Sequence, residues 1–225
     1  MAEPLNQDPI PYAVRRAPRA KRVRVAVEAD GRIVVLLPPR AAEREAVAAV
    51  RELRPWIERR VREAADRTRR MARPPGVVPF LGGELRLAPE AGRTRVHRRG
   101  DALLVPRDAA LQLEAIERWY RRSARAEIVP RLDEAAVALG RSYTALTIRN
   151  QRTRWGSCSA TGAMSFNWRL LLAPEAVLDY VIWHEACHLV HLDHSSRFWS
   201  LLTEHRPAYR EPQRWLKANG AALAL

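Results

Sequence analysis

The stretch that decides the fold is His184-Glu185-Ala186-Cys187-His188, an H-E-x-x-H run inside an apolar segment typical of a buried helix. Because an α-helix has about 3.6 residues per turn, positions four apart lie on one face, and both imidazoles can bind one ion. Glu185 lies beside that face, where it can take a proton from a metal-bound water. The run predicts a zinc hydrolase. The alternative is an amphipathic helix with two surface histidines.

The histidines of the chain are clustered around this run. Structural histidines scatter along a sequence, so clustering favours a metal site. The segment 192–196 predicts a turn that leads to a new helix. Five of the six histidines fall between positions 184 and 205: His184, His188, His191, His194 and His205.

A catalytic zinc usually has three protein ligands and one open position, so a third ligand is needed. His194 follows His184 by ten positions, a spacing that works when the helix stops near His188 and the chain folds back over the metal. We favour His194 for this reason. His191 lies about one turn beyond His188 if the helix continues, which suits a position at the rim of the site. A second helix could instead deliver a carboxylate, and the candidates are then Glu204 and Glu211.

Three blocks of sequence resemble a known family. They are residues 154–159 (Arg-Trp-Gly-Ser-Cys-Ser), 165–170 (Ser-Phe-Asn-Trp-Arg-Leu), and 184–188 together with 194–199 (His-Ser-Ser-Arg-Phe-Trp). The chain resembles the YgjP-like zinc metallopeptidases, which are related to the SprT-like and WLM proteases. The resemblance is close over about 145–205 and extends to the N-terminal half only in layout. It implies that His184, His188 and His194 bind zinc and that Glu185 is the catalytic base.

The sequence departs from this family at two positions. Ala186 stands where the family often has Leu, and His191 is an extra histidine. Neither change removes a group that the chemistry needs.

The segment before the zinc helix predicts a surface for substrate. Residues 145–150 and 164–172 have strand-like sequences. An edge strand beside the metal would pair with an extended peptide through main-chain hydrogen bonds, which tolerates many side chains. Besides His191, the residues that we expect to contact substrate or to support the ligands are Arg152, Arg154, Asn167 and Trp168. For an aromatic such as Trp168, ordinary core packing is the alternative.

Length and composition limit the class of protein. At 225 residues the chain can bury one sizeable core. No run approaches the roughly 18 consecutive apolar residues of a membrane span. Cys158 and Cys187 are too few for a disulfide framework, and we expect both to be thiols. These features predict a cytoplasmic protein without a membrane partner. The H-E-x-x-H run and the edge strand described above predict that its substrate is a peptide or protein.

The formal charge of +14 raises the question of a polyanionic partner. One cluster of cations runs from Arg15 to Arg24, and a second series of arginines lies on the predicted helix between residues 51 and 70. Of the 39 basic residues, 37 are Arg, a bias that genome composition can also produce. A solvated helix face is one interpretation of the second series. Binding of nucleic acid or of another acidic partner is the other.

The remaining patterns predict an α+β fold. We expect an N-terminal, basic, strand-rich subdomain (1–108) packed on a C-terminal zincin-like metallopeptidase domain (109–225) that contains the H-E-x-x-H helix. The expected elements are a hairpin around Asp30-Gly31, a helix over 41–71 bent at Pro55, strands near Leu85, Val96 and Leu103–Val105, and a helix over 110–139 with a break at Pro130.

Three functions fit these observations. The leading hypothesis is a Zn²⁺-dependent metallopeptidase with Glu185 as general base. The second keeps this chemistry and adds nucleic-acid binding by the basic N-terminal half, as in SprT-like proteases that cleave DNA-bound proteins. The third is a non-catalytic binding module whose zinc only stabilises the fold.

Overall fold

The structure is a computed structural model that describes residues 10–28, 30–151 and 154–225. Contacts divide the chain into two compact units, Met1–Ala72 and Arg73–Leu225, which we call the N-terminal and C-terminal units. The strands between residues 77 and 106 group with the C-terminal unit, although the sequence prediction placed them before its boundary at 108. That boundary between folding domains stays a prediction, as does the packing of one domain on the other.

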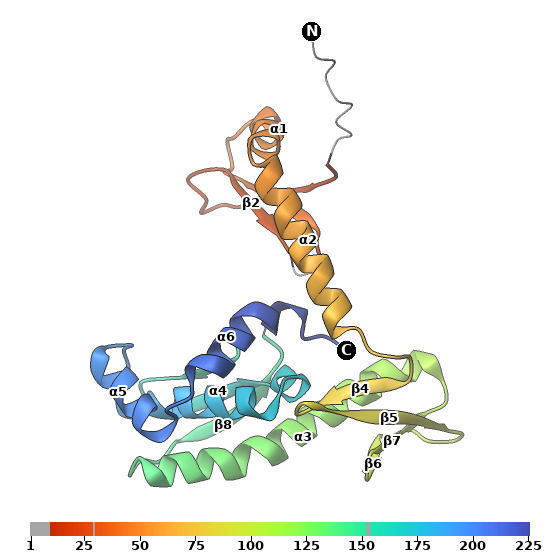
Figure 1. Ribbon diagram of the computed structural model, residues 1–225, viewed down its shortest axis with the longest axis vertical. Helices are drawn as coiled ribbons and strands as arrows, with labels where there is room; N and C mark the ends of the chain where they lie inside the picture. The colour runs from red at the N-terminus through yellow and green to blue at the C-terminus, as the bar shows by residue number, and fades with distance from the viewer. Residues whose placement is uncertain (1–9, 29, 152–153) are drawn as a thin grey trace. The chain divides into compact units, whose positions relative to one another are not determined.

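The N-terminal unit is a three-stranded sheet covered by two helices (Figure 1). Strands β1 (Ala13–Arg16), β2 (Arg24–Val27) and β3 (Ile33–Leu37) lie in the order β1-β3-β2. Strand β3 is parallel to β1 and antiparallel to β2. The β2–β3 hairpin was predicted, and its turn contains Gly31, whose φ of 85° favours glycine.

Two helices bury one face of this sheet. Alternate residues of β3 point into the core, where Val35 and Leu37 pack against Ile57. Helix α1 (Glu43–Glu52) ends before Leu53, and α2 (Arg54–Met71) begins with a proline in its first turn. The bend predicted at Pro55 is therefore a boundary between two helices, because proline suits a first turn and not a helix interior.

The C-terminal unit begins with a four-stranded sheet. Strands β4 (Val77–Phe80), β5 (Gly83–Glu90), β6 (His97–Arg99) and β7 (Ala102–Pro106) lie in the order β4-β5-β7-β6. Strands β5 and β7 are parallel, and the other pairs are antiparallel. The strands predicted near Leu85 and over Leu103–Val105 are confirmed, whereas Val96 lies just before β6.

Helix α3 (Ala109–Ala138) is one continuous helix and contains Pro130, so the predicted break was wrong. Ile128 and Leu132 on either side of this proline are fully buried, and their packing holds the helix together across the missing hydrogen bond. Asp108 caps the start of the helix, since its side chain accepts a hydrogen bond from the Ala110 N–H at 2.9 Å.

A second sheet of the C-terminal unit contains β8 (Ala145–Arg149), β9 (Gly156–Cys158) and β10 (Ala163–Asn167), in the order β8-β10-β9. Strand β10 is parallel to β8 and antiparallel to β9, so β9 is an edge strand. The predicted strand over 164–172 ends early, because Asn167 accepts a hydrogen bond from the Arg169 N–H and caps a short 3₁₀ helix, η1 (Trp168–Leu172).

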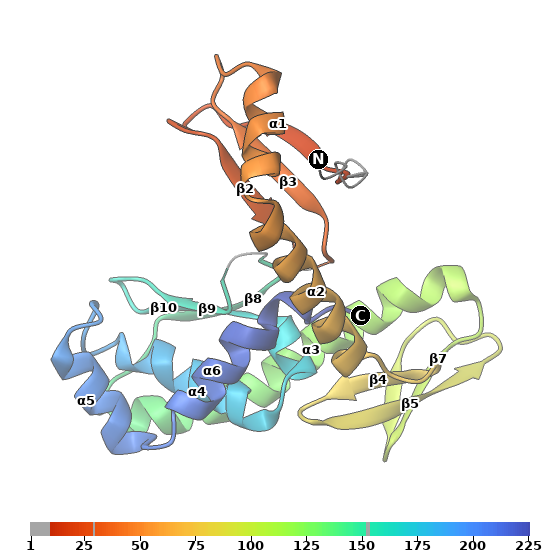
Figure 2. The same ribbon diagram turned by 45° about the horizontal axis from the view of Figure 1, so that its top comes forward.

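Helix α4 (Glu175–Cys187) is the central helix of this unit. It contacts α3, β9 and η1 as well as α5 (Ser196–His205) and α6 (Arg210–Asn219), and the last turn of the chain is η2 (Gly220–Ala222). Figure 2 shows α4 and α6 side by side. Within the described parts of the chain, no helix is both long and apolar enough to span a bilayer.

Candidate metal centre

The H-E-x-x-H run forms the end of α4. His184 and Glu185 lie in its last turn, and His188 is the residue at which the helix stops. The chain then reverses and enters α5 at Ser196. Asp193 supports the reversal, because its carboxylate accepts a hydrogen bond from the Ser195 N–H at 3.3 Å. This turn brings His194 back to the end of α4.

Three imidazoles meet at this point. The potential ligand atoms of His184, His188 and His194 all lie within 4.8 Å of one another. The Nε2 atoms of His184 and His194 are 3.0 Å apart, close to the roughly 3.3 Å that tetrahedral zinc with bonds of about 2.05 Å requires. The Nδ1–H of His188 donates to the backbone carbonyl of His191 at 2.9 Å, which leaves its Nε2 available.

Two of the three imidazoles, those of His184 and His188, are in the protonation state that a metal needs. Burial, with smaller contributions from the neighbouring His188 and His194, lowers the pKa of His184 to about 3. Burial also lowers the pKa of His188. Both rings are therefore neutral near pH 7, with lone pairs free for a cation. The Nδ1 atom of His184 is buried and has no hydrogen-bond partner among the described residues.

Phe198 forms the wall behind the three imidazoles. Its ring centroid lies 4.9 Å from that of His184, 4.6 Å from His188 and 4.8 Å from His194. The side chain is fully buried. The sequence analysis assigned Phe198 no role. Its position four residues after His194 could have indicated one, because side chains of a helix tilt toward its start, and the start of α5 lies next to His194.

Glu185 is buried beside the imidazoles with 7% of its surface exposed. Burial raises its pKa to about 7, while the charge of Arg154 and a hydrogen bond from the backbone of Cys158 act in the opposite direction. Strand β9 lies directly against this carboxylate. A Cβ atom on Gly156 would lie 2.5 Å from the Cγ of Glu185, so the site requires glycine there. Sequence reasoning missed this residue.

The other predicted site residues lie in different places. Arg154 is exposed and precedes β9, and Arg152 lies outside the described residues. His191 contributes its backbone carbonyl to the site. Asn167 is buried and binds the loop before β9, because its Nδ2 donates to the carbonyls of Gln151 at 2.7 Å and Arg154 at 3.3 Å.

Trp168 lies in the core, with 1% of its surface exposed and its ring 5.6 Å from that of Tyr120. This placement matches the core-packing alternative considered for it. The structure thus brings the three histidines and Glu185 together and leaves Trp168 among buried side chains. The functional roles of all these residues stay predictions.

Aromatic side chains continue from the imidazoles to a hollow in the surface. Tyr180 lies one helical turn before His184, at a centroid distance of 5.8 Å. Tyr209 stacks on Trp199 at 5.6 Å, and Trp199 in turn lies 5.6 Å from His194. Tyr180 and Tyr209 also line a hollow of about 380 Å³ between α4 and α6.

Three converging imidazoles beside a buried carboxylate are the arrangement of a metal-dependent hydrolase. The chain belongs to the YgjP-like family, because the model of the YgjP-like metallopeptidase domain matches residues 21–219. The family predicted from the three sequence blocks is thereby confirmed, and the chain is a metallopeptidase.

Among solved structures, the chain is similar to the metallopeptidase zymogen abylysin of Pyrococcus abyssi, with 24% sequence identity and a TM-score of 0.37. That match covers 40% of this chain and 92% of the other. Comparison with curated proteins gave no match. The family assignment therefore rests on the domain match alone.

Proposed function

We propose that the protein is a zinc-dependent endopeptidase in which His184, His188 and His194 hold the ion and Glu185 is the general base. The observation that carries this proposal is the convergence of three ligand nitrogens within 4.8 Å beside a buried carboxylate. An all-histidine set suits zinc better than the hard cations that prefer oxygen ligands. Zinc bound there would polarise the scissile carbonyl and lower the pKa of its water.

Glu185 has the environment of a proton carrier. Burial raises the pKa of its carboxyl to about 7, so the group would take up and release a proton at little cost near neutral pH. It would accept the proton of the attacking water and deliver it to the leaving amine. The backbone bond from Cys158 fixes the carboxylate against β9.

Strand β9 supports the binding of an extended peptide. It pairs with β10 on one side, and its other edge has no partner strand among the described residues. A peptide that pairs with this edge would run past Glu185, since Gly156 of β9 lies against that side chain. Main-chain pairing of this kind predicts broad sequence specificity. In this proposal Arg154, which is exposed just before β9, would bind a carboxylate or carbonyl oxygen of the substrate.

A purely structural zinc site is the competing interpretation. Structural sites normally have four protein ligands. Within the described ranges, the cluster has three members. A structural site would also gain nothing from a buried carboxylate next to its ligands, because such burial costs stability.

The experiment that tests the proposal compares wild type with Glu185→Gln on an unfolded protein and on a mixed library of quenched fluorescent peptides. We expect zinc content to be equal in both proteins, and kcat/KM to fall on the order of 10²–10⁴-fold in the variant. A zinc-loaded Glu185→Gln protein that cleaves as fast as wild type would rule out the assigned base. A zinc-loaded wild type that cleaves nothing would favour the structural site.

A further inference from the structure

We propose that the segment Arg15–Arg24 binds the phosphate backbone of a nucleic acid. This surface belongs to the N-terminal unit, and its binding would be a function in addition to the proposed peptidase activity. The segment has no acidic residue, and all of its basic side chains are exposed. We call these six cations the basic segment: Arg15, Arg16, Arg19, Lys21, Arg22 and Arg24.

The fold brings Arg15 and Arg24, at the two ends of this segment, close to each other. Arg15 in β1 and Arg24 in β2 both pair with Leu36 of the central strand β3, from opposite sides. With strands about 4.8 Å apart, their Cα atoms lie about 10 Å from each other. Paired residues point to the same face of a sheet, so both side chains share the face of Leu36. That face is opposite the one that Val35 and Leu37 bury against the helices.

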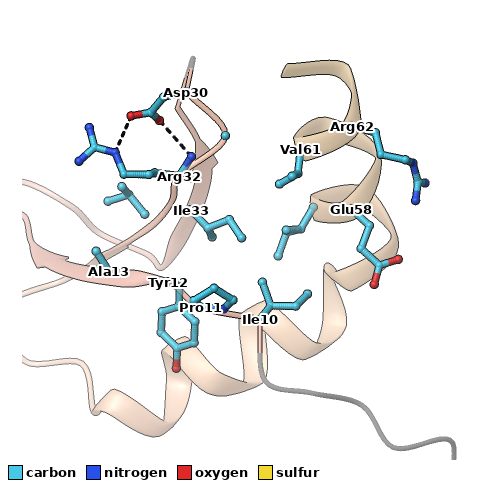
Figure 3. A pocket seen from close by; sticks show the side chains of 13 residues that line it. Ile10, Pro11, Tyr12, Ala13, Asp30, Arg32, Ile33, Glu58, Val61 and Arg62 are labelled. Atoms are coloured by element: carbon cyan, nitrogen blue, oxygen red, sulfur yellow. Dashed lines mark hydrogen bonds and ion pairs between the residues drawn. The ribbon is translucent and has the colours of Figure 1, made fainter. Parts of the chain in front are cut away.

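Five other arginines of this unit form ion pairs with nearby carboxylates. Figure 3 shows one case, in which Arg32 donates both its backbone N–H and its guanidinium to Asp30. Five of these ion pairs join Arg32 to Asp30, Arg54 to Glu58, Arg59 to Glu63, Arg60 to Glu63 and Arg69 to Asp66. Four of the seven arginines of α2 are among them, which fits the interpretation of this helix face as a solvated one.

The basic segment has no such compensation, because none of its members forms an ion pair within the described residues. Arg16 instead donates to the carbonyls of Pro38, Pro39 and Ala41, at 3.4, 3.0 and 3.0 Å. Carbonyl groups orient this guanidinium without cancelling its charge. Arg16 pairs with Leu37 and so points to the other face of the sheet. The positive surface that we propose is therefore formed by the five remaining cations of the segment.

The chemistry of the patch favours phosphate over an acidic protein. Protein interfaces rely on buried aromatic or aliphatic anchors. The segment has no aromatic residue, and the large apolar side chain exposed beside it is Val14, at 42%. Without rings to stack on bases, it would contact the backbone alone and bind without sequence preference. If the five cations other than Arg16 each contact one phosphate of a duplex, the logarithm of the association constant should fall with the logarithm of the salt concentration with a slope of about −4.5.

The test measures binding of the full-length protein to a fluorescein-labelled 25-base-pair duplex of mixed sequence by fluorescence anisotropy, at salt concentrations from about 50 to 200 mM. In the test variant, four cations of the basic segment become Gln: Arg15, Arg19, Arg22 and Arg24. A matched control loses the same charge from α2, with Gln at Arg59, Arg60, Arg67 and Arg69. Two-residue variants, Arg15/Arg19 and Arg22/Arg24, replace the test variant should it fail to fold.

We expect wild type and control to bind alike, with a slope near −4.5. The test variant should bind at least about tenfold more weakly, with a slope near −1. Equal loss in test variant and control, or no binding by wild type at about 50 mM salt, would overturn the proposal. So would tighter binding of wild type to phosphatidylserine vesicles than to the duplex. Binding is measured in the Glu185→Gln background as well, so the result does not depend on peptidase activity.

Discussion

Replacement of Gly156 by alanine should remove peptidase activity and leave the metal in place. The added Cβ would lie 2.5 Å from Cγ of Glu185, 2.7 Å from its Oε1 and 2.8 Å from its Cδ. Carbon atoms in favourable contact are about 3.5–4.0 Å apart. The carboxylate, the strand or both must therefore move by about 1 Å.

The expected cost to catalysis follows from this displacement. A misplacement of about 1 Å can lower a rate about 10²-fold, and complete loss of the base lowers it up to about 10⁴-fold. The cost to stability is smaller. Overpacking costs about 1–3 kcal/mol, and the loss of glycine's freedom in the unfolded chain offsets about 0.4–1 kcal/mol. The histidines come from the end of α4 and the turn before α5, so zinc should stay at wild-type stoichiometry.

The assay combines kcat/KM on an unfolded protein substrate, zinc content and urea unfolding. Gly83→Ala is the matched control, because a Cβ there would meet the Phe80 carbonyl oxygen at an ordinary distance of 3.5 Å. The reasoning is refuted by a Gly156→Ala protein that folds, binds zinc and cleaves at the wild-type rate. Parallel loss of zinc and activity would show that β9 supports the ligands and not the base.

Three further predictions concern stability. In metal-free protein, a carboxyl whose pKa is raised from 4.5 to about 7 by burial destabilises the fold as pH rises through that interval. In urea unfolding, the free energy of unfolding of Glu185→Gln relative to wild type should rise by roughly 3 kcal/mol between pH 4.5 and pH 8. If it does not rise, burial does not raise the pKa of Glu185. Tyr120→Phe should cost about 1–2 kcal/mol by leaving the Pro79 carbonyl without its donor. Leu132→Ala in α3 should lower the unfolding free energy by about 2–5 kcal/mol, and a smaller loss would argue against tight packing across Pro130.

Features with a local signal could be predicted from the sequence. The Asp30-Gly31 turn joins two strands because glycine adopts the positive φ that the turn needs. The spacing of His184 and His188 places both rings on one side of a helix end, and the ten-residue interval to His194 matches the reversal after α4. The strands of the first C-terminal sheet were found for the same reason, since apolar runs and glycine turns alternate there.

Features that depend on distant contacts could not be predicted. Helix α3 continues through Pro130 because buried neighbours outweigh the missing hydrogen bond. The chain leaves β10 at Asn167 because that side chain caps η1 and also binds the loop before β9. The parallel pairing of β8 with β10 and the close approach of Gly156 to Glu185 join residues far apart in sequence. Such long-range contacts produce no periodic pattern in the sequence from which they could be predicted.

The most direct test of the three-histidine centre is zinc per chain in wild type, His194→Ala and His191→Ala. We predict about one zinc in wild type and a clear loss in His194→Ala. His191→Ala should keep its zinc, because the contact to His188 comes from the backbone carbonyl of that residue. A wild type without zinc after refolding with metal, or a His194→Ala protein with full zinc, would contradict the account.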